Sequence, residues 1–248
     1  INMEKAEYDC THKSGALRDS DKMTGASKTS VKDPYSFDTT PKNTHMLLIE
    51  RVPNESLVLE VGSASGYMGE YLQKNKNCTV YGIEPDTARA AEAEGRGYEA
   101  VFCGTSDDAI SAGVFSGKEF DVLLLADVLE HIWESEKALE RLLPFVKNGG
   151  RVVVSLPNVA HYSVIAMLFR GEWKMASAGI MDRTHMRWFT RKSAMKMFTD
   201  VGLSVEEVRP AAGYIERRWG GFGKYLLFAW PDFFAPQFIF VCNKKSSL

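Results

Sequence analysis

Residues 57–86, LVLEVGSASGYMGEYLQKNKNCTVYGIEPD, contain the pattern that decides the fold. The stretch opens with a short apolar run, Leu57–Val61, turns through the small residues 62–66, and continues with helical character from residue 66. A second apolar run, 79–83, leads to Glu84, which lies 18 residues beyond Gly66. A βαβ nucleotide site places its ribose-binding acid at a similar offset of roughly 20 residues. The stretch therefore predicts a strand, a tight loop, a helix and a second strand around an adenosine-type cofactor.

The acidic residue at the end of the first predicted strand indicates which kind of cofactor binds. Ala64, Gly66 and Gly69 nearly satisfy the GxGxxG pattern of dinucleotide sites, but this pattern alone is weakly specific. Glu60 comes just before the loop, where its carboxylate would repel a pyrophosphate and attract a ligand that carries an ammonium and a sulfonium. We therefore expect a sulfonium cofactor rather than a dinucleotide.

The composition and charge limit the class of protein. The chain has 248 residues, of which 45% are hydrophobic and 25% charged, and this is ordinary for one catalytic domain. Its net charge of -2 argues against strong non-specific attraction to nucleic acid, so we expect no DNA partner. The four cysteines form no CxxC pair, which argues against a zinc cluster or a disulfide framework. The sequence also lacks a transmembrane-length apolar run, and we expect a cytoplasmic protein.

The rest of the chain extends the first unit into a sheet. Residues 98–103, 120–126 and 151–158 are strand-like runs, separated by helical segments at 86–97 and 135–150, the second of which is expected to end at Gly149 and Gly150. Residues 204–210 and 237–244 are typical of a final antiparallel pair. The order predicts an α/β fold, a doubly wound, seven-stranded, mostly parallel, Rossmann-like sheet with helices on both faces and a small cap.

Two pairs of motifs resemble known enzymes. EVGSASG at 60–66 followed by GIEPD at 82–86 resembles motifs I and II of the class I S-adenosylmethionine-dependent methyltransferases, with Ser63, Ala64 and Ser65 where the family loop is usually richer in glycine. LPNVAH at 156–161 followed by DRTHMRWFT at 182–190 resembles bacterial methyltransferases of the small-molecule or glycan type, and the likeness covers about 57–203. The resemblance implies methyl transfer from S-adenosylmethionine.

The resemblance also implies which residues contact the cofactor. The loop and the acid before it would hold the methionine part, Glu84 the ribose, and the segment from Leu125 to Asp127 the mouth from which the methyl leaves. Thr105, Ser106 or Asp107 would lie near the adenine edge, although Asp107 fits a helix N-terminus equally well. The cofactor-binding residues that we predict are Glu60, Gly62, Ser63, Ala64, Gly66, Glu84, Pro85, Thr105, Ala126 and Asp127.

Histidines are the natural candidates for catalysis. If the acceptor is a hydroxyl, its proton must leave, and a positioned base contributes roughly 10² to 10⁴ in rate. His131, His185 and His161 belong to segments expected near the carboxyl edge of the sheet, where open α/β folds bind ligands. We predict these three as bases or acceptor-orienting groups, in that order, and a structural role stays open for each.

A divalent metal is an alternative use of the same segment. Asp127, Glu130 and His131 have the spacing i, i+3, i+4, which would bring their side chains to one side of a helical turn. With His185 they would form a carboxylate and imidazole set suited to Mg²⁺ or Mn²⁺. The interpretation that we prefer has no metal.

The acceptor follows less directly from the sequence. We expect O-methylation of a small-molecule or sugar/glycan acceptor, with an RNA 2′-O-methyltransferase that uses a divalent metal and a non-catalytic adenosine-cofactor-binding module as alternatives. An NAD-type oxidoreductase would have to tolerate Glu60 near a phosphate. Basic side chains would suit an anionic acceptor, although solvated surface charges are the simpler interpretation: Arg183, Arg187, Arg191, Lys192, Arg217 and Arg218.

The domain organisation has three expected parts. Residues 1–40 are polar and form a leader or a lid, in which Pro34, Tyr35 and Phe37 would close over a cofactor. Residues 41–248 form the methyltransferase domain, which begins with a helix at 41–52 that carries His45 at its surface or cap. Cap insertions are expected near 158–188 and 212–236, the second rich in aromatic residues and suited to a substrate cap, a homodimer surface or a membrane-proximal contact.

Overall fold

A computed structural model describes residues 43–211 and 213–245, with the side chains of 213–219 excluded. The leader or lid predicted for residues 1–40, with Pro34, Tyr35 and Phe37, lies outside the described residues.

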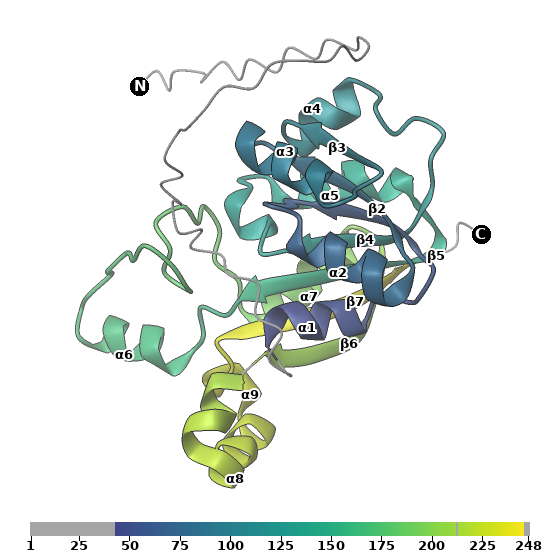
Figure 1. Ribbon diagram of the computed structural model, residues 1–248. Coiled ribbons are helices and arrows are strands. Elements are labelled where there is room, and N and C mark those ends of the chain that lie inside the picture. The colour runs from purple at the N-terminus through teal and green to yellow at the C-terminus, as the bar shows by residue number, and fades with distance from the viewer. Residues whose placement is uncertain (1–42, 212, 246–248) are drawn as a thin grey trace, which may run out of the picture.

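Seven strands form one sheet (Figure 1). They are β1 (Leu57–Val61), β2 (Thr79–Glu84), β3 (Ala100–Cys103), β4 (Phe120–Ala126), β5 (Val146–Pro157), β6 (Leu203–Ala211) and β7 (Gln237–Lys244). Their order is β3-β2-β1-β4-β5-β7-β6, in which the first five pair in parallel and β7 is antiparallel to both β5 and β6. The predicted doubly wound, mostly parallel sheet is confirmed, and so is its final antiparallel pair.

Helices cover both faces of this sheet (Figure 1). Successive residues of a strand point to opposite faces, and β4 divides accordingly, with Leu123 and Leu125 in one core and Val122 and Leu124 in the other. The first core also receives side chains from α4 (Ser106–Ser111), α5 (Ser135–Leu142) and α7 (Arg191–Asp200), and the second from α1 (Thr44–Glu50), α2 (Tyr67–Lys76) and α3 (Thr87–Gly95).

One predicted helix boundary is wrong. The helix expected to run to Gly149 and Gly150 ends at Leu142, and a short 3₁₀ turn, η2 (Leu143–Phe145), leads into β5 from Val146. Pro144 explains the early end, because a proline has no N–H to continue an α-helix and its ring clashes with the preceding turn. Both glycines therefore belong to the first part of the strand.

Two segments extend beyond the sheet and its covering helices (Figure 1). The first contains α6 (Tyr162–Phe169), which forms a small apolar cluster with the segment around Met181. An isolated β-bridge in this segment pairs Ala176 with Asp182. The second contains α8 (Gly213–Ala229), interrupted at Gly220, and α9 (Pro231–Phe234). Among the described residues no helix has the length and apolar character needed to cross a bilayer.

Candidate active site

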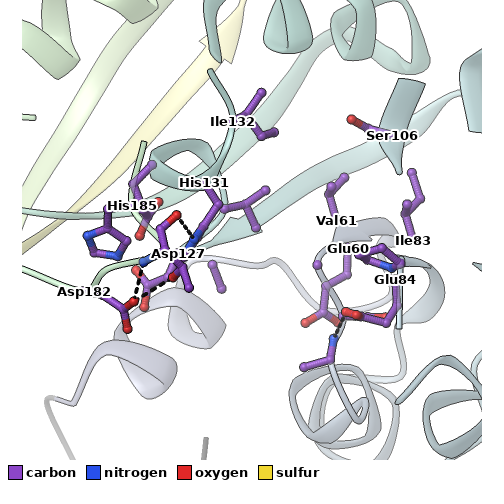
Figure 2. A pocket seen from close by; sticks show the side chains of 18 of the residues that line it. Glu60, Val61, Ile83, Glu84, Ser106, Asp127, His131, Ile132, Asp182 and His185 are labelled. Atoms are coloured by element: carbon purple, nitrogen blue, oxygen red, sulfur yellow. Dashed lines mark hydrogen bonds between the residues drawn. The ribbon is translucent and has the colours of Figure 1, made fainter. Parts of the chain in front are cut away.

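A cavity of about 870 Å³ opens at the carboxyl ends of β1, β2 and β4. It lies between β1 and β4, where the order of the strands in the sheet reverses. Open α/β sheets bind their ligands at this point. Figure 2 shows two ends to the cavity, one with Glu60 and Glu84 and another with Asp127, His131 and His185. All ten residues predicted to contact the cofactor line it: Glu60, Gly62, Ser63, Ala64, Gly66, Glu84, Pro85, Thr105, Ala126 and Asp127.

The loop between β1 and α2 is shaped by backbone requirements. Gly66 has φ +83°, and a Cβ there would lie 2.7 Å from the Cα of Ala93, so only glycine fits. Ala64 also adopts a positive φ of 47°, and its N–H donates to Oε2 of Glu84 at 2.8 Å. Ser63 is 4% exposed, and its Oγ has no hydrogen-bond partner among the described residues. Because buried hydroxyls are normally paired, this atom fits a polar group of a bound ligand.

Glu60 is buried at the end of β1 and held by a residue from another segment. It is 2% exposed, and the hydroxyl of Tyr98 donates to its Oε2 at 2.6 Å. Burial raises the pKa of Glu60 to about 7, against the lowering effect of the Tyr98 hydrogen bond. A cationic ligand beside this carboxylate would favour its charged form. The acid therefore has the position and the environment expected of a group that binds a sulfonium cofactor.

Gly69, the last position of the near-GxGxxG pattern, contacts the side chain of Tyr98 and does not line the cavity. A Cβ on Gly69 would lie 2.2 Å from the hydroxyl oxygen of Tyr98, and the Gly69 N–H donates to that oxygen at 3.1 Å. Tyr98 therefore connects the helix to Glu60, a role that the sequence analysis missed because Tyr98 lies 38 residues from Glu60.

Glu84 is fixed at the end of β2 by backbone donors. Its Oε2 accepts from Ala64 and its Oε1 from the N–H of Asp86 at 3.0 Å. Each carboxylate oxygen keeps further acceptor capacity, as a ribose diol would need. The structure therefore fits the predicted cofactor at this end of the cavity on three counts: a buried acid, an unpaired hydroxyl and a fixed second acid.

Asp127 does not share a helical turn with Glu130 and His131, so that expectation is wrong. It has φ +55°, and the 3₁₀ turn η1 (Leu129–His131) begins only two residues later. Its Oδ1 accepts from the Ser155 hydroxyl at 2.6 Å and from the Gln237 amide. These contacts direct Asp127 to β5 and β7, and neither partner is near Asp127 in the sequence.

His131 and His185 meet at the other end of the cavity (Figure 2). Their ring centroids are 4.9 Å apart with planes at 74°. Nδ1 of His131 lies 3.2 Å from the carbonyl oxygen of Thr184, and Nδ1 of His185 lies 3.1 Å from that of Ile180. A carbonyl only accepts, so each Nδ1 carries a proton, and in the neutral form of either ring the lone pair lies on Nε2. Burial, with His131 nearby, lowers the pKa of His185 and favours this neutral form.

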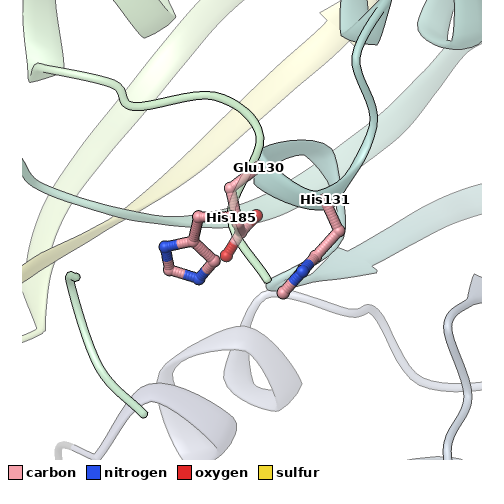
Figure 3. Close-up of side chains that lie close together, drawn as sticks. All are labelled: Glu130, His131 and His185. Atoms are coloured by element: carbon pink, nitrogen blue, oxygen red, sulfur yellow. The ribbon is translucent and has the colours of Figure 1, made fainter. Parts of the chain in front are cut away.

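Glu130 completes this group (Figure 3). It is 1% exposed, and neither of its carboxylate oxygens has a hydrogen-bond partner among the described residues. Burial raises the pKa of Glu130 well above its ordinary value. One ligand atom from each of Glu130, His131 and His185 can be chosen so that all lie within 4.8 Å of one another.

Other predicted residues lie away from the cavity. His161 caps α6, where its Nδ1 accepts from the N–H of Ser163 at 3.3 Å, and it is not part of the cavity lining. Leu125 is fully buried in the core. Arg187 forms a bidentate ion pair with Glu136, and Arg191 forms a bidentate ion pair with Asp232. The side chains of Arg217 and Arg218 lie outside the described residues, while Arg183 and Lys192 do not line the cavity.

The lining is acidic. Among the described residues it contains one arginine or lysine, Arg89, together with His45, which was expected at the surface or cap of the first helix and lies in the first turn of α1. Burial raises the pKa of Glu60, Asp127 and Glu130 and so lessens their charge near neutral pH, but acids still outnumber bases, and anions are disfavoured in this lining. Six carboxylic side chains contribute to it: Glu60, Glu84, Asp107, Asp127, Glu130 and Asp182.

Comparison with known proteins places this geometry in a family. A model of the family described as "Methyltransferase domain" matches residues 39–208, which is more than half of the chain. No curated protein matches the sequence significantly.

Solved structures share the fold at low sequence identity. A chain from the complex of the Haloferax volcanii Trm112 methyltransferase activator with a putative methyltransferase has a TM-score of 0.59 and 15% identity, covering 82% of this chain and 89% of that one. A putative S-adenosylmethionine-dependent methyltransferase from Listeria monocytogenes gives 0.57 and 14%, covering 81% and 96%. The plantazolicin methyltransferase BpumL in complex with SAH gives 0.53 and 17%, covering 82% and 80%. With the family match, the chain belongs to the methyltransferase-domain family and is a class I S-adenosylmethionine-dependent methyltransferase.

Proposed function

We propose that this enzyme transfers the methyl group to a hydroxyl of a neutral small-molecule or glycan acceptor. The observation that carries the proposal is the His131–His185 pair, which lines the same cavity as the residues suited to the cofactor and has both Nδ1 atoms turned to carbonyls. The lone pairs that remain on Nε2 are suited to polarise a hydroxyl and favour loss of its proton.

The chain's own residues divide the work between the two ends of the cavity. When bound, S-adenosylmethionine supplies a methyl group already activated by a sulfonium. Glu60 and the loop after β1 orient the methionine part, and Glu84 accepts from the ribose hydroxyls. The walls align the acceptor oxygen with the methyl carbon and exclude water, which is the main requirement of this reaction. BpumL, which shares the fold, is in complex with SAH, the demethylated form of this cofactor.

The charges of the lining support a neutral acceptor over the anionic one considered from the sequence. Acids outnumber bases there, and Arg187 is paired with Glu136 instead of facing the cavity. An RNA backbone would bring several phosphates to this acidic surface and is disfavoured for the same reason. A neutral polyol, sugar or phenol introduces no such repulsion.

A methyl-transfer assay with labelled cofactor tests the proposal. Neutral polyols, glycosides and phenols are compared with their phosphorylated counterparts and with matched amines, and the methylated atom is located by mass spectrometry. We expect transfer to oxygen, with a preference for the uncharged member of each pair. Transfer confined to nitrogen or to phosphorylated acceptors would contradict the proposal.

Single substitutions separate catalysis from cofactor binding. His131→Ala and His185→Ala should each lower turnover by roughly 10² to 10⁴, while the affinity for S-adenosylmethionine changes little because both rings lie at the far end of the cavity from Glu60. Unchanged turnover in both variants would remove the pair from the reaction.

A further inference from the structure

The group formed by Glu130, His131 and His185 has an unexplained feature. A buried carboxylate is normally neutralised by a cation or several hydrogen bonds, because burial without a partner costs several kcal/mol. Glu130 is 1% exposed, and both of its oxygens lack a partner among the described residues. Figure 3 shows this carboxylate between the two imidazole rings. The arrangement places an unpaired acid beside two lone-pair donors.

The histidines are oriented as metal ligands commonly are. A ligating histidine usually donates its other ring N–H to a carbonyl or carboxylate, which fixes the tautomer. His131 has this arrangement with the Thr184 carbonyl and His185 with the Ile180 carbonyl. Both free nitrogens can therefore serve one ion together with a Glu130 oxygen.

The segments that carry these ligands are fixed to each other. The carbonyl oxygen of Glu130 accepts from the N–H groups of Met186 and Arg187 at 2.8 and 3.0 Å. The Arg187 guanidinium donates to the carbonyl of Trp133 at 2.9 Å and pairs with Glu136. The 3₁₀ turn and the loop with His185 therefore stay together without an ion, and the site needs only a small contraction from the present 4.8 Å spread.

We propose that Glu130, His131 and His185 bind a divalent ion of the zinc class, with at least one position open to the cavity. Two imidazoles and one carboxylate favour Zn²⁺ and similar borderline ions over Mg²⁺ or Ca²⁺, which prefer oxygen ligands. Asp127 is left out of the ligand set, because its Oδ1 accepts hydrogen bonds from Ser155 and Gln237 and the group of mutually close ligand atoms consists of Glu130, His131 and His185. The three-residue site differs in this way from the four-residue alternative considered from the sequence.

The use of the ion in the reaction rests on the proposed function. An ion held by Glu130, His131 and His185 would lower the pKa of an acceptor hydroxyl at its open position, and the proton of that hydroxyl would pass to water. The oxygen electron pair then forms the new C–O bond as the C–S bond breaks, and the electrons of that bond remain on the sulfur, which becomes a neutral thioether. With the ion bound, the two histidines would act as its ligands, and the ion would take over the polarisation of the hydroxyl that the free Nε2 lone pairs supply without it.

Metal binding to the full chain tests the site without any acceptor. The protein is stripped with a chelator, dialysed against Zn²⁺ or Co²⁺, and analysed for metal content, for Co²⁺ visible absorption and for affinity by calorimetry. We expect one ion per chain and a Co²⁺ spectrum typical of nitrogen and oxygen ligands. Glu130→Gln, which keeps the side-chain shape and removes the charge, should weaken binding by more than about 100-fold, as should His185→Ala.

His161→Ala is the matched control, since it removes a histidine outside the cavity and should keep the ion. Circular dichroism and unfolding curves establish that each variant is folded. A wild-type chain that retains less than one tenth of an ion, or a Glu130→Gln chain that binds as tightly as wild type, would overturn the proposal. Absence of methyl transfer to every acceptor tests the proposed function alone and leaves the metal measurement unaffected.

Discussion

The hydroxyl of Tyr98 donates a 2.6 Å hydrogen bond to Oε2 of Glu60 inside the protein. The two residues come from different parts of the nucleotide-binding half of the sheet, and the bond fixes the acid that faces the cofactor end of the cavity. Burial still prevails over this bond and raises the pKa of Glu60 to about 7. The charge of the acid can therefore change near neutral pH.

Cofactor affinity should depend on pH through Glu60. The cationic cofactor prefers the ionised carboxylate, so affinity should rise as pH increases to about 7 and then level off. Below that pH it should fall by up to about tenfold per pH unit. Calorimetry from pH 5.5 to 8.5 measures this. Glu60→Gln should bind more weakly with a flatter profile, and an equally steep profile in that variant would assign the dependence to another group.

The same shift predicts how stability without cofactor depends on pH. The pKa of Glu60 is raised in the folded protein from 4.5 to about 7, so the protonated form favours folding. Its stabilising contribution is fully present below pH 4.5 and is lost as pH rises to about 7. The difference between wild type and Glu60→Gln in urea unfolding should therefore grow across this window. A constant difference would contradict the raised pKa.

Tyr98→Phe should weaken cofactor binding at neutral pH. The substitution removes the donor that lowers the pKa of Glu60 and the acceptor of the Gly69 N–H. The midpoint of the affinity profile should move to higher pH, and the free energy of unfolding should fall by about 1–3 kcal/mol because buried groups lose partners. Tyr81→Phe, in a tyrosine outside the cavity lining, is the control and should leave the profile in place. An unmoved midpoint in Tyr98→Phe would show that the bond does not tune Glu60.

Two glycines within helices should respond in opposite directions to alanine. Gly69→Ala places a methyl 2.2 Å from the Tyr98 ring and hydroxyl, so the free energy of unfolding should fall by about 1–3 kcal/mol or more. Gly95→Ala in α3 meets nothing within 4 Å, and it should stabilise by roughly 0.5–1 kcal/mol because alanine loses less backbone entropy. Urea unfolding compares them. Equal effects of the two substitutions would mean that the packing of Tyr98 does not require a glycine at position 69.

The order of strands and the cofactor end of the cavity could be predicted because their signals are local. A short apolar run, a loop of small residues and an acid at a set offset all lie within residues 57–86. The proximity of His131 and His185 could also be predicted, because both belong to segments expected at the carboxyl edge of the sheet. Tyr98 could not be identified in this way, because its bond to Glu60 joins the segment between α3 and β3 to β1, 38 residues away in the sequence.

Asp127, at the end of the cavity that holds the two histidines, shows where prediction from sequence spacing fails. Its spacing to Glu130 suggested a shared helical turn, but the positive φ of Asp127 breaks that periodicity. The conformation is held by Ser155 and Gln237, which lie 28 and 110 residues away. No local pattern contains these partners. Only the structure shows that Asp127 is hydrogen-bonded to Ser155 and Gln237, whereas the Glu130 carboxylate has no hydrogen-bond partner among the described residues.

Asp127→Ala should therefore act mainly on stability. Alanine loses the acceptor for the Ser155 hydroxyl and the Gln237 amide, and it fits the left-handed conformation less well than aspartate. The free energy of unfolding should fall by about 1–3 kcal/mol. Asp127→Asn keeps a side-chain oxygen and tolerates a positive φ, so it should recover most of this loss. Urea unfolding of the three proteins at one pH measures the difference, with Asp107→Ala as an exposed carboxylate control. If Asp127→Ala were as stable as Asp107→Ala, the contacts to β5 and β7 would contribute nothing to the conformation of this residue, and Asp127 would be free to join the neighbouring ligands.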